Sequence, residues 1–183
     1  TIIAHSMGGH VTLRYAGIYP ETVRKLAIIE GVGPPQEWID TELKKPIEKR
    51  IRDWVDNKRE ASGLFHKRYP TLKDAYERMK EANKFLSDDQ ARHLTRHGIS
   101  QNEDGTFSWK FDNYMRYTPP VDIHYEEIFR LWGNIACPVR LLWGVDSFAS
   151  NPERDGRMDY FQDATLSVYE NAGHWLHHDQ LDK

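Results

Sequence analysis

Thr1-Ile2-Ile3-Ala4-His5-Ser6-Met7-Gly8-Gly9 opens the chain and decides the fold. A run of β-branched residues ends at a serine with small neighbours, and a stretch of helical character follows. This order predicts a sharp strand-to-helix turn that holds the Ser6 hydroxyl above the end of a sheet. Such a turn is crowded and favours small residues two positions before and two positions after the serine. Ala4 and Gly8 occupy these two positions.

Two later segments contain an acid and a histidine in similar settings. Residues 141–146 form an apolar run that ends in the carboxylate of Asp146. His174 lies behind a glycine, shortly after the strand-like run at residues 165–169. A serine, an acid and a histidine in this chain order are typical of a catalytic triad carried by an α/β sheet.

The chain resembles the α/β-hydrolase family over its whole length, and within it is most similar to the serine hydrolase-like proteins and the capped esterases. The resemblance implies an α/β-hydrolase fold, of which this chain holds parallel strands five to eight together with a helical cap insertion. Four pieces of sequence carry the resemblance: Ala4-His5-Ser6-Met7-Gly8-Gly9, Tyr19-Pro20-Glu21 before the run at 26–30, Cys137-Pro138-Val139 before Gly144-Val145-Asp146, and Gly173-His174-Trp175.

The resemblance implies a role for each member of the triad. Ser6 is the expected nucleophile, and His174 is expected to take its proton and return it to the leaving group. Asp146 is the expected acid that holds the imidazole in the correct tautomer. Glu30 also follows a strand-like run and is the alternative acid, whereas Asp155 is a weaker candidate.

The tetrahedral intermediate of acyl transfer carries an oxyanion that needs hydrogen-bond donors. The resemblance implies that the backbone N–H of Met7, the residue after the nucleophile, is one donor. In the family a second donor comes from a loop after the third strand, which we expect to lie outside this chain. The resemblance implies no cofactor.

In the family, the turn that carries the nucleophile follows the fifth strand of an eight-stranded sheet, yet here it lies at the start of the chain. We therefore expect the chain to be the C-terminal portion of a longer protein, with strands one to four and most of strand five upstream. We expect its other end to fall partway into the last helix. A targeting signal would also lie upstream.

A change in composition near Gly33-Pro34-Pro35 separates two kinds of sequence. Residues 1–33 and 126–183 contain the apolar strand-like runs, whereas residues 34–125 are polar, charged and helical in pattern. We therefore expect a partial hydrolase core at 1–33, a helical cap insertion at 34–125, and the continued core at 126–183.

The expected cap contains signals for several short helices. Pro46 suits the first position of one helix, and Thr71 begins another. Ser87 and Gln90 form a capping box for a third helix that ends at Gly98. Alternating aromatic residues then predict a short extended segment at 107–111.

Aromatic residues of the expected cap either line an acyl pocket or hold its small helices together. The second role is the more common one for such side chains. We nevertheless expect a small-molecule acyl substrate of apolar character, because a cap over the nucleophile leaves some apolar wall facing it. The aromatic residues in question are Trp38, Phe65, Tyr69, Tyr76, Phe85, Trp109, Tyr114 and Tyr117.

Composition narrows the class of protein. The 183 residues carry a net charge of −3, which offers no basic field for nucleic acid. No apolar run approaches the roughly 20 residues that span a bilayer. The single cysteine, Cys137, precedes an apolar strand and is expected to be a buried thiol, compatible with a reducing compartment. We therefore expect a cytoplasmic enzyme without nucleic-acid or membrane partners.

His174, His177, His178 and Asp179 are close enough in sequence to suggest a metal site. No second group of ligands accompanies them, and polar residues on a solvent-facing segment explain His177 and His178 more simply. We expect no bound metal.

Together these features predict a serine-dependent hydrolase of carboxylic esters or similar acyl compounds that works through an acyl-enzyme. A serine at the nucleophile position argues against the dehalogenase and epoxide-hydrolase relatives, which use an aspartate there. Two alternatives remain: a carbon–carbon bond hydrolase with the same triad, and a ligand-binding member of the fold with low turnover. Substrate identity and oligomeric state are not encoded in any motif found.

Overall fold

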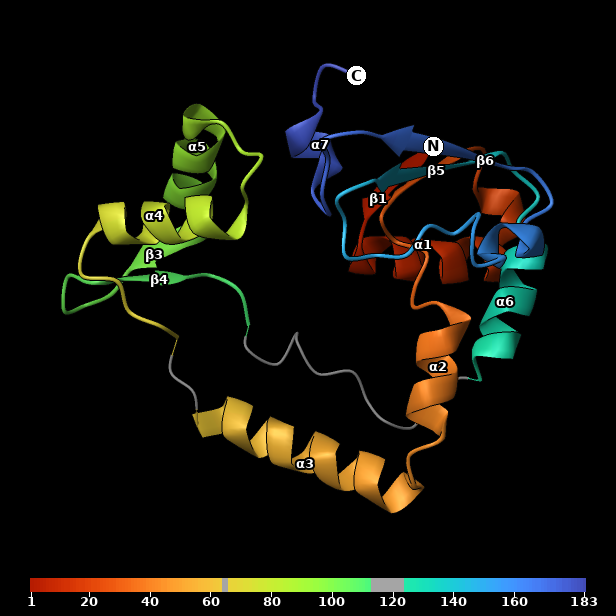
Figure 1. Ribbon diagram of the computed structural model, residues 1–183, viewed down its shortest axis with the longest axis horizontal. Helices are drawn as coiled ribbons and strands as arrows, with labels where there is room; N and C mark the ends of the chain where they lie inside the picture. The colour runs from red at the N-terminus through yellow and green to blue at the C-terminus, as the bar shows by residue number, and fades with distance from the viewer. Residues whose placement is uncertain (64–65, 113–123) are drawn as a thin grey trace. The chain divides into compact units, whose positions relative to one another are not determined.

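The computed structural model describes residues 1–63, 66–112 and 124–183. The chain forms two compact units, the first made of Thr1–Lys44 with Ile123–Lys183 and the second of Lys45–Asp122 (Figure 1). The second unit begins at Lys45, whereas the sequence placed the start of the insertion near Pro34. The first unit contains every predicted catalytic residue.

A four-stranded parallel sheet organises the first unit. Its strands are β1 (Ile2–His5), β2 (Leu26–Ile29), β5 (Val139–Gly144) and β6 (Ala164–Tyr169), in the order β1-β2-β5-β6. All three neighbouring pairs are parallel. The predicted α/β fold with a parallel sheet is thereby confirmed.

The strands begin nearly level with one another. Ile2 pairs with Leu26, Leu26 with Val139, and Val139 with Ala164. Because the strands are parallel, their carboxyl ends lie along one edge of the sheet, which is where ligands bind in open α/β sheets. The segments that follow the four strands are therefore brought together there.

Successive side chains of each strand point to opposite faces of the sheet, and apolar residues pack on both faces. On one face, Ile28 and Leu141 pack with Leu13 of α1 (Met7–Ile18) and Trp132 of α6 (Tyr125–Gly133). Figure 1 shows α1 and α6 beside the sheet. On the other face, Ile29 packs with a smaller cluster that includes Ala172, Leu176, Leu142 and Tyr169.

Shorter helices complete the first unit. They are η1 (Pro20–Thr22), α2 (Gln36–Leu43), η3 (Arg157–Tyr160) and α7 (Leu176–Asp179). Arg157 of η3 is buried and donates to both carboxylate oxygens of Asp155, at 2.8 and 2.7 Å, and to the Gly33 carbonyl oxygen. These bonds join the segment after β5 to the segment after β2.

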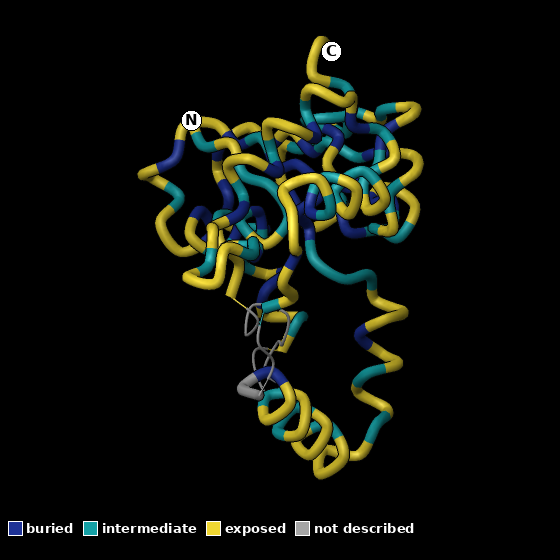
Figure 2. The backbone as a smooth tube through the Cα atoms, turned by 90° about the vertical axis from the view of Figure 1, so that its left-hand side faces the viewer, coloured by how far each residue is buried: buried dark blue, intermediate teal, exposed yellow. Residues whose placement is uncertain are grey.

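The second unit contains α3 (Ile47–Gly63), α4 (Leu72–Ala82), α5 (Asp88–Gly98) and a hairpin of β3 (Ile99–Gln101) with β4 (Phe107–Trp109). Capping boxes at Thr71 and Ser87 start α4 and α5, as predicted for Ser87. The sequence did not predict β3. Along α3 most residues are exposed (Figure 2).

Two aromatic residues of the second unit pack against each other. Tyr69 is buried and lies edge-on to Trp109, with ring centroids 6.4 Å apart, in a cluster with Ala75 and Ile99. This favours the packing role over the pocket role for these two residues. Phe65, Tyr114 and Tyr117 lie outside the described residues.

Cys137 is buried next to β5, and burial raises the pKa of its thiol. In the described ranges, no helix combines the length and the apolar composition needed to cross a membrane.

Candidate active site

Ser6 lies at the sharp turn that the sequence predicts between β1 and α1. Its backbone has φ 51° and ψ −120°, a combination that side-chain-bearing residues rarely adopt. The Ser6 N–H donates to the Ile29 carbonyl oxygen at 2.9 Å, and the Ser6 carbonyl oxygen accepts from the Gly9 N–H at 2.9 Å. These bonds to a strand and a helix hold the strained residue in place.

Small residues allow the turn to pack closely, although the tightest pair differs from the predicted one. A Cβ atom on Gly8 would lie 3.8 Å from the Ala4 Cβ, an ordinary contact. A Cβ atom on Gly9 would lie 2.7 Å from the Gly31 Cα. Sequence reasoning missed this approach between α1 and the segment after β2, because Gly31 is distant in the chain.

His174 is buried beside Ser6. Its Nε2 lies 2.8 Å from the Ser6 Oγ. Its Nδ1 lies 3.3 Å from the Glu30 Oε2, and a carboxylate oxygen can only accept from an N–H. Nδ1 therefore carries the proton, and Nε2 is left free to accept the hydrogen of the Ser6 hydroxyl.

Glu30 follows β2, and its side chain is fully buried. Besides His174, two groups donate to its carboxylate. The Gly144 N–H donates to Oε1 at 2.7 Å, and the Ser147 hydroxyl donates to Oε2 at 2.5 Å. Three donors thus compensate for removing the carboxylate from water, which is otherwise strongly unfavourable.

Asp146, the preferred acid at the sequence level, does not reach the imidazole. Its side chain is exposed, and within the described residues the structure records no hydrogen bond or ion pair between its carboxylate and His174. Its backbone N–H donates to the Ala172 carbonyl oxygen at 2.9 Å, which turns the chain after β5 so that Ser147 faces Glu30 instead. The ranking of Asp146 above Glu30 is therefore corrected by this geometry.

Asp155, the weaker candidate for the acid, forms hydrogen bonds with Ser150 and Arg157. Burial alone would raise the pKa of its carboxyl group, but hydrogen bonds from Arg157 and Ser150 outweigh this, and the net effect lowers the pKa. The carboxylate thus forms part of a structural ion pair.

Backbone strain is concentrated around the same group of residues. In the described ranges, three non-glycine residues have positive φ: Ser6 at 51°, Glu30 at 53° and Asn171 at 53°. Each follows a strand of the parallel sheet, and Asn171 begins the loop that carries His174. Clustered strain of this kind is typical of functional sites, where the surrounding structure holds it.

His5 forms a hydrogen bond to the backbone of the loop that carries His174. His5 Nε2–H donates to the His174 carbonyl oxygen at 2.8 Å, and the two rings lie 4.8 Å apart. The ring of His177 lies 4.6 Å from that of His5. Burial lowers the pKa of His5, and burial together with nearby histidines lowers the pKa of His177 to about 4. Both rings are therefore neutral at pH 7.

The Met7 N–H is the first amide of α1, and so it lacks an acceptor within the helix. Met7 directly follows Ser6 in the chain. A free amide at a helix N-terminus is suited to stabilising negative charge.

Asp179, near His174 in the sequence, forms a hydrogen bond within the loop that carries His174. Asp179 Oδ2 accepts from the Gly173 N–H at 2.8 Å. Among the residues that the structure describes, no group of three or more His, Cys, Asp or Glu side chains is arranged to hold a metal ion.

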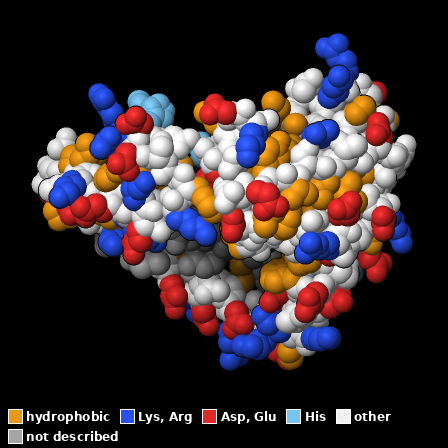
Figure 3. Space-filling view, turned by 45° about the horizontal axis from the view of Figure 1, so that its top comes forward, with side chains coloured by type: hydrophobic (Ala, Val, Ile, Leu, Met, Phe, Trp, Pro, Cys, Tyr) orange, Lys and Arg blue, Asp and Glu red, His pale blue; other side chains and the backbone are white. Residues whose placement is uncertain are grey.

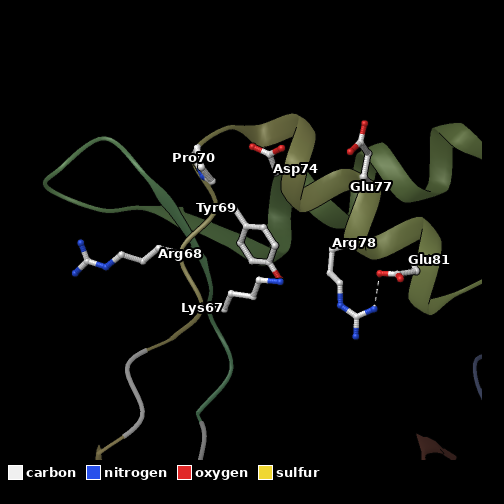
Figure 4. A pocket seen from close by; sticks show the side chains of 8 residues that line it. All are labelled: Lys67, Arg68, Tyr69, Pro70, Asp74, Glu77, Arg78 and Glu81. Atoms are coloured by element: carbon white, nitrogen blue, oxygen red, sulfur yellow. Dashed lines mark hydrogen bonds and ion pairs between the residues drawn. The ribbon is translucent and has the colours of Figure 1, made fainter.

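Two surface hollows in the described residues involve none of Ser6, His174, Glu30 and Asp146. One lies within the second unit, where charged side chains surround Tyr69 (Figure 4). Arg78 pairs there with Glu81 at 2.9 Å, and Arg68 pairs with Asp104. Exposed ion pairs of this kind are typical of a solvated protein surface. The other hollow lies in the first unit and is lined by Gln36, Phe129, Asp155, Gly156, Arg157, Asp159 and Tyr160.

Known proteins resemble this chain in sequence and in fold. The family model described as the alpha/beta hydrolase family matches residues 1–183. A serine hydrolase-like protein of Danio rerio is 30% identical over 150 residues, which cover 80% of this chain and 44% of that protein. The chain thus spans less than half the length of this curated relative.

Solved structures share the fold at low sequence identity. A thioesterase domain from the curacin biosynthetic pathway has a TM-score of 0.71 and 22% identity, and the match covers 97% of this chain and 60% of that one. An esterase from M. tuberculosis has a TM-score of 0.71 and 16% identity, with 97% and 57% covered.

The parallel sheet, the serine turn at its carboxyl edge and the match over the full chain identify one class of protein. The chain belongs to the alpha/beta hydrolase family.

Proposed function

We propose that the protein is a serine-dependent hydrolase of carboxylic esters or similar acyl compounds, acting through an acyl-enzyme. The observation that carries the proposal is the continuous path from Ser6 Oγ to His174 Nε2, and from His174 Nδ1 to Glu30 Oε2, at 2.8 and 3.3 Å. A serine is a poor nucleophile unless a base within hydrogen-bond reach takes its proton, and this path supplies the base.

In the proposed reaction, Ser6 Oγ attacks the substrate carbonyl carbon while its proton moves to His174 Nε2. The tetrahedral intermediate then collapses. The bond to the leaving group breaks, Nε2–H gives its proton to that group, and the acyl group stays on Ser6. A water molecule, deprotonated by His174, attacks the acyl-enzyme and releases the acid.

Glu30 is proposed as the acid of the triad, in place of Asp146. It would hold the Nδ1–H tautomer and stabilise the imidazolium that forms when Ser6 loses its proton. The Gly144 N–H and the Ser147 hydroxyl would keep its carboxylate in position. The Met7 N–H is proposed as one oxyanion donor.

The names of two similar proteins support the reaction class within this proposal. One structural neighbour is a thioesterase domain and another is an esterase. Both names describe cleavage of an acyl group from a heteroatom, the reaction that the Ser6–His174 pair suits. The second unit corresponds, in this proposal, to the helical cap expected from the sequence.

The test uses the full-length protein and a fluorophosphonate probe. We expect the probe to add its mass to the peptide that contains Ser6, and we expect Ser6→Ala to abolish labelling and ester turnover together. Labelling that persists in Ser6→Ala would refute the assignment. Labelling without steady-state ester turnover would favour a ligand-binding member of the fold.

A further inference from the structure

We propose that Phe148 forms an apolar wall of the substrate site and selects acyl groups with an alkyl or aryl chain, an inference that rests on the proposed serine-hydrolase function. Phe148 lies in the segment after β5. Its side chain is 81% exposed, more than any other large hydrophobic side chain in the described ranges. Exposure alone identifies no site, because single exposed apolar residues are common on protein surfaces. Three further observations connect the exposed Phe148 side chain with the proposed active site.

The backbone on both sides of Phe148 is fixed by hydrogen bonds. The Ser147 hydroxyl donates to Glu30 Oε2 at 2.5 Å and accepts from the Ala149 N–H at 3.0 Å. The Trp143 indole N–H donates to the Ala149 carbonyl oxygen at 2.8 Å. The exposed ring therefore stands on a segment that is tied to the proposed catalytic acid.

The ring of Phe148 packs on the proposed catalytic base. Its centroid lies 4.5 Å from that of the His174 imidazole, with a 40° angle between the ring planes. Phe148 thus covers part of the imidazole while most of its own surface stays free. A phenylalanine held only for packing would bury that surface, because burying such a side chain stabilises the fold.

Two other exposed apolar residues are sequence neighbours of Ser6 and His174. Met7 follows the nucleophile and Trp175 follows the histidine, and both side chains are exposed. The Trp175 ring meets the His174 ring edge-on at 5.3 Å. Figure 3 shows hydrophobic side chains gathered on the visible face of the first unit. Phe148 and Trp175, from two separate segments, therefore both supply apolar surface next to His174.

Geometry then limits what the substrate presents to Phe148. The reacting carbonyl carbon must approach Ser6 Oγ, which lies 2.8 Å from His174 Nε2. The groups bonded to that carbon consequently lie close to the imidazole and to the ring on it. An alkyl or aryl chain gains free energy by leaving water against Phe148, whereas a charged chain would lose hydration without a polar partner from this side chain.

The experiment compares acyl chain length in the full-length protein. We measure kcat/KM for p-nitrophenyl acetate and p-nitrophenyl octanoate, which share one leaving group. In Phe148→Ala the octanoate-to-acetate ratio is expected to fall about 10-fold, the scale of discrimination by apolar pocket contacts. Phe148→Leu keeps apolar bulk and is expected to retain most of the ratio. Leu181→Ala, a change at another exposed apolar residue, should leave the ratio unchanged.

A second measurement separates this inference from the proposed function. The rates of Ser6 labelling by ethyl and octyl fluorophosphonates report alkyl contact without requiring ester turnover. A loss of octyl preference in Phe148→Ala without any ester turnover would sustain the Phe148 inference and refute the proposed function. An unchanged preference in Phe148→Ala, or an equal fall for both chain lengths, would overturn the inference. Absence of Ser6 labelling by either probe in the wild-type protein would overturn both.

Discussion

Glu30 is a fully buried carboxylate at the carboxyl end of a strand, and its neighbours explain why it is stable there. It accepts hydrogen bonds from a backbone amide, a hydroxyl and the imidazole of His174. A structural role alone would be served equally well by an apolar residue, which needs no such partners. The three donors instead hold one oxygen facing Nδ1.

We predict that the single substitution Glu30→Gln lowers ester turnover by about 10⁴-fold, the loss seen when a triad acid no longer holds the histidine tautomer. Asp146→Asn should change turnover by less than about threefold, because its exposed side chain has no recorded contact with His174. Steady-state kinetics of the full-length protein, with Ser6→Ala as the inactive reference, measures both. The opposite ranking would return the acid to Asp146.

The partly buried His177 gives a prediction for the pH dependence of stability. The pKa of His177 is lowered from an ordinary value of 6.5 to about 4 in the folded protein. Below pH 6.5 the unfolded chain binds a proton at His177, whereas the folded protein does so only near pH 4. This contribution to stability is therefore lost progressively as the pH falls from 6.5 toward 4. We expect the denaturant midpoint to be lower at pH 5 than at pH 7.5.

The matched variant for this effect is His177→Gln, which cannot titrate. We expect the midpoint of this variant to depend less on pH than that of the wild type. His5, whose pKa burial also lowers, contributes in the same direction and remains in the variant. An identical pH dependence in the two proteins would contradict the prediction.

Among the elements, α1 depends on the segment after β2 for its position. Gly9 of α1 lies against Gly31, and a Cβ atom on Gly9 would also lie 2.9 Å from the Ile28 Cγ2. Both contacts lie close behind Ser6. The helix that carries the Met7 amide is thus positioned by a backbone-to-backbone contact that only glycine permits.

We predict that Gly9→Ala lowers the free energy of unfolding by about 1–3 kcal/mol, the usual cost of forcing extra volume into a packed core. Gly8→Ala is the control, since its Cβ would meet only the Ala4 Cβ at 3.8 Å, and alanine is the better helix former. Chemical denaturation of the two variants provides the comparison. Equal destabilisation by both changes would show that the contact with Gly31 does not limit packing.

For the molecule as a whole, the order β1-β2-β5-β6 leaves β1 at an edge of the sheet. Ile3 on this strand is 70% exposed, and Val11 and Ile18 of the adjacent α1 are exposed as well. An exposed apolar edge strand offers unpaired backbone groups to other chains.

We therefore predict that the 183-residue chain self-associates in solution. Ile3→Lys should increase the monomer fraction in sedimentation experiments, because a charge on an edge strand opposes pairing. Leu181→Lys places the same charge at an exposed leucine outside the sheet and should have a smaller effect. A wild-type chain that remains monomeric at high concentration would refute this prediction.

The sequence by itself predicted the parallel sheet, the turn at Ser6 and, among nine histidines, the one that lies beside Ser6. These features depend on local patterns. An apolar run followed by a small residue, a serine and a glycine encodes its own turn, and a histidine behind a glycine after the last strand is recognised by its position in the chain order. The capping box at Ser87 is local in the same way.

Only the tertiary structure decided which acid faces the imidazole and which glycines touch. Glu30 and Asp146 both follow a strand, so their local patterns are equivalent. The difference lies in the turn after β5, where a bond from the Asp146 N–H to the Ala172 carbonyl oxygen leaves that side chain in solvent while Glu30 points to His174. Contacts between segments more than 100 residues apart depend on register and packing across the sheet, which no local pattern encodes.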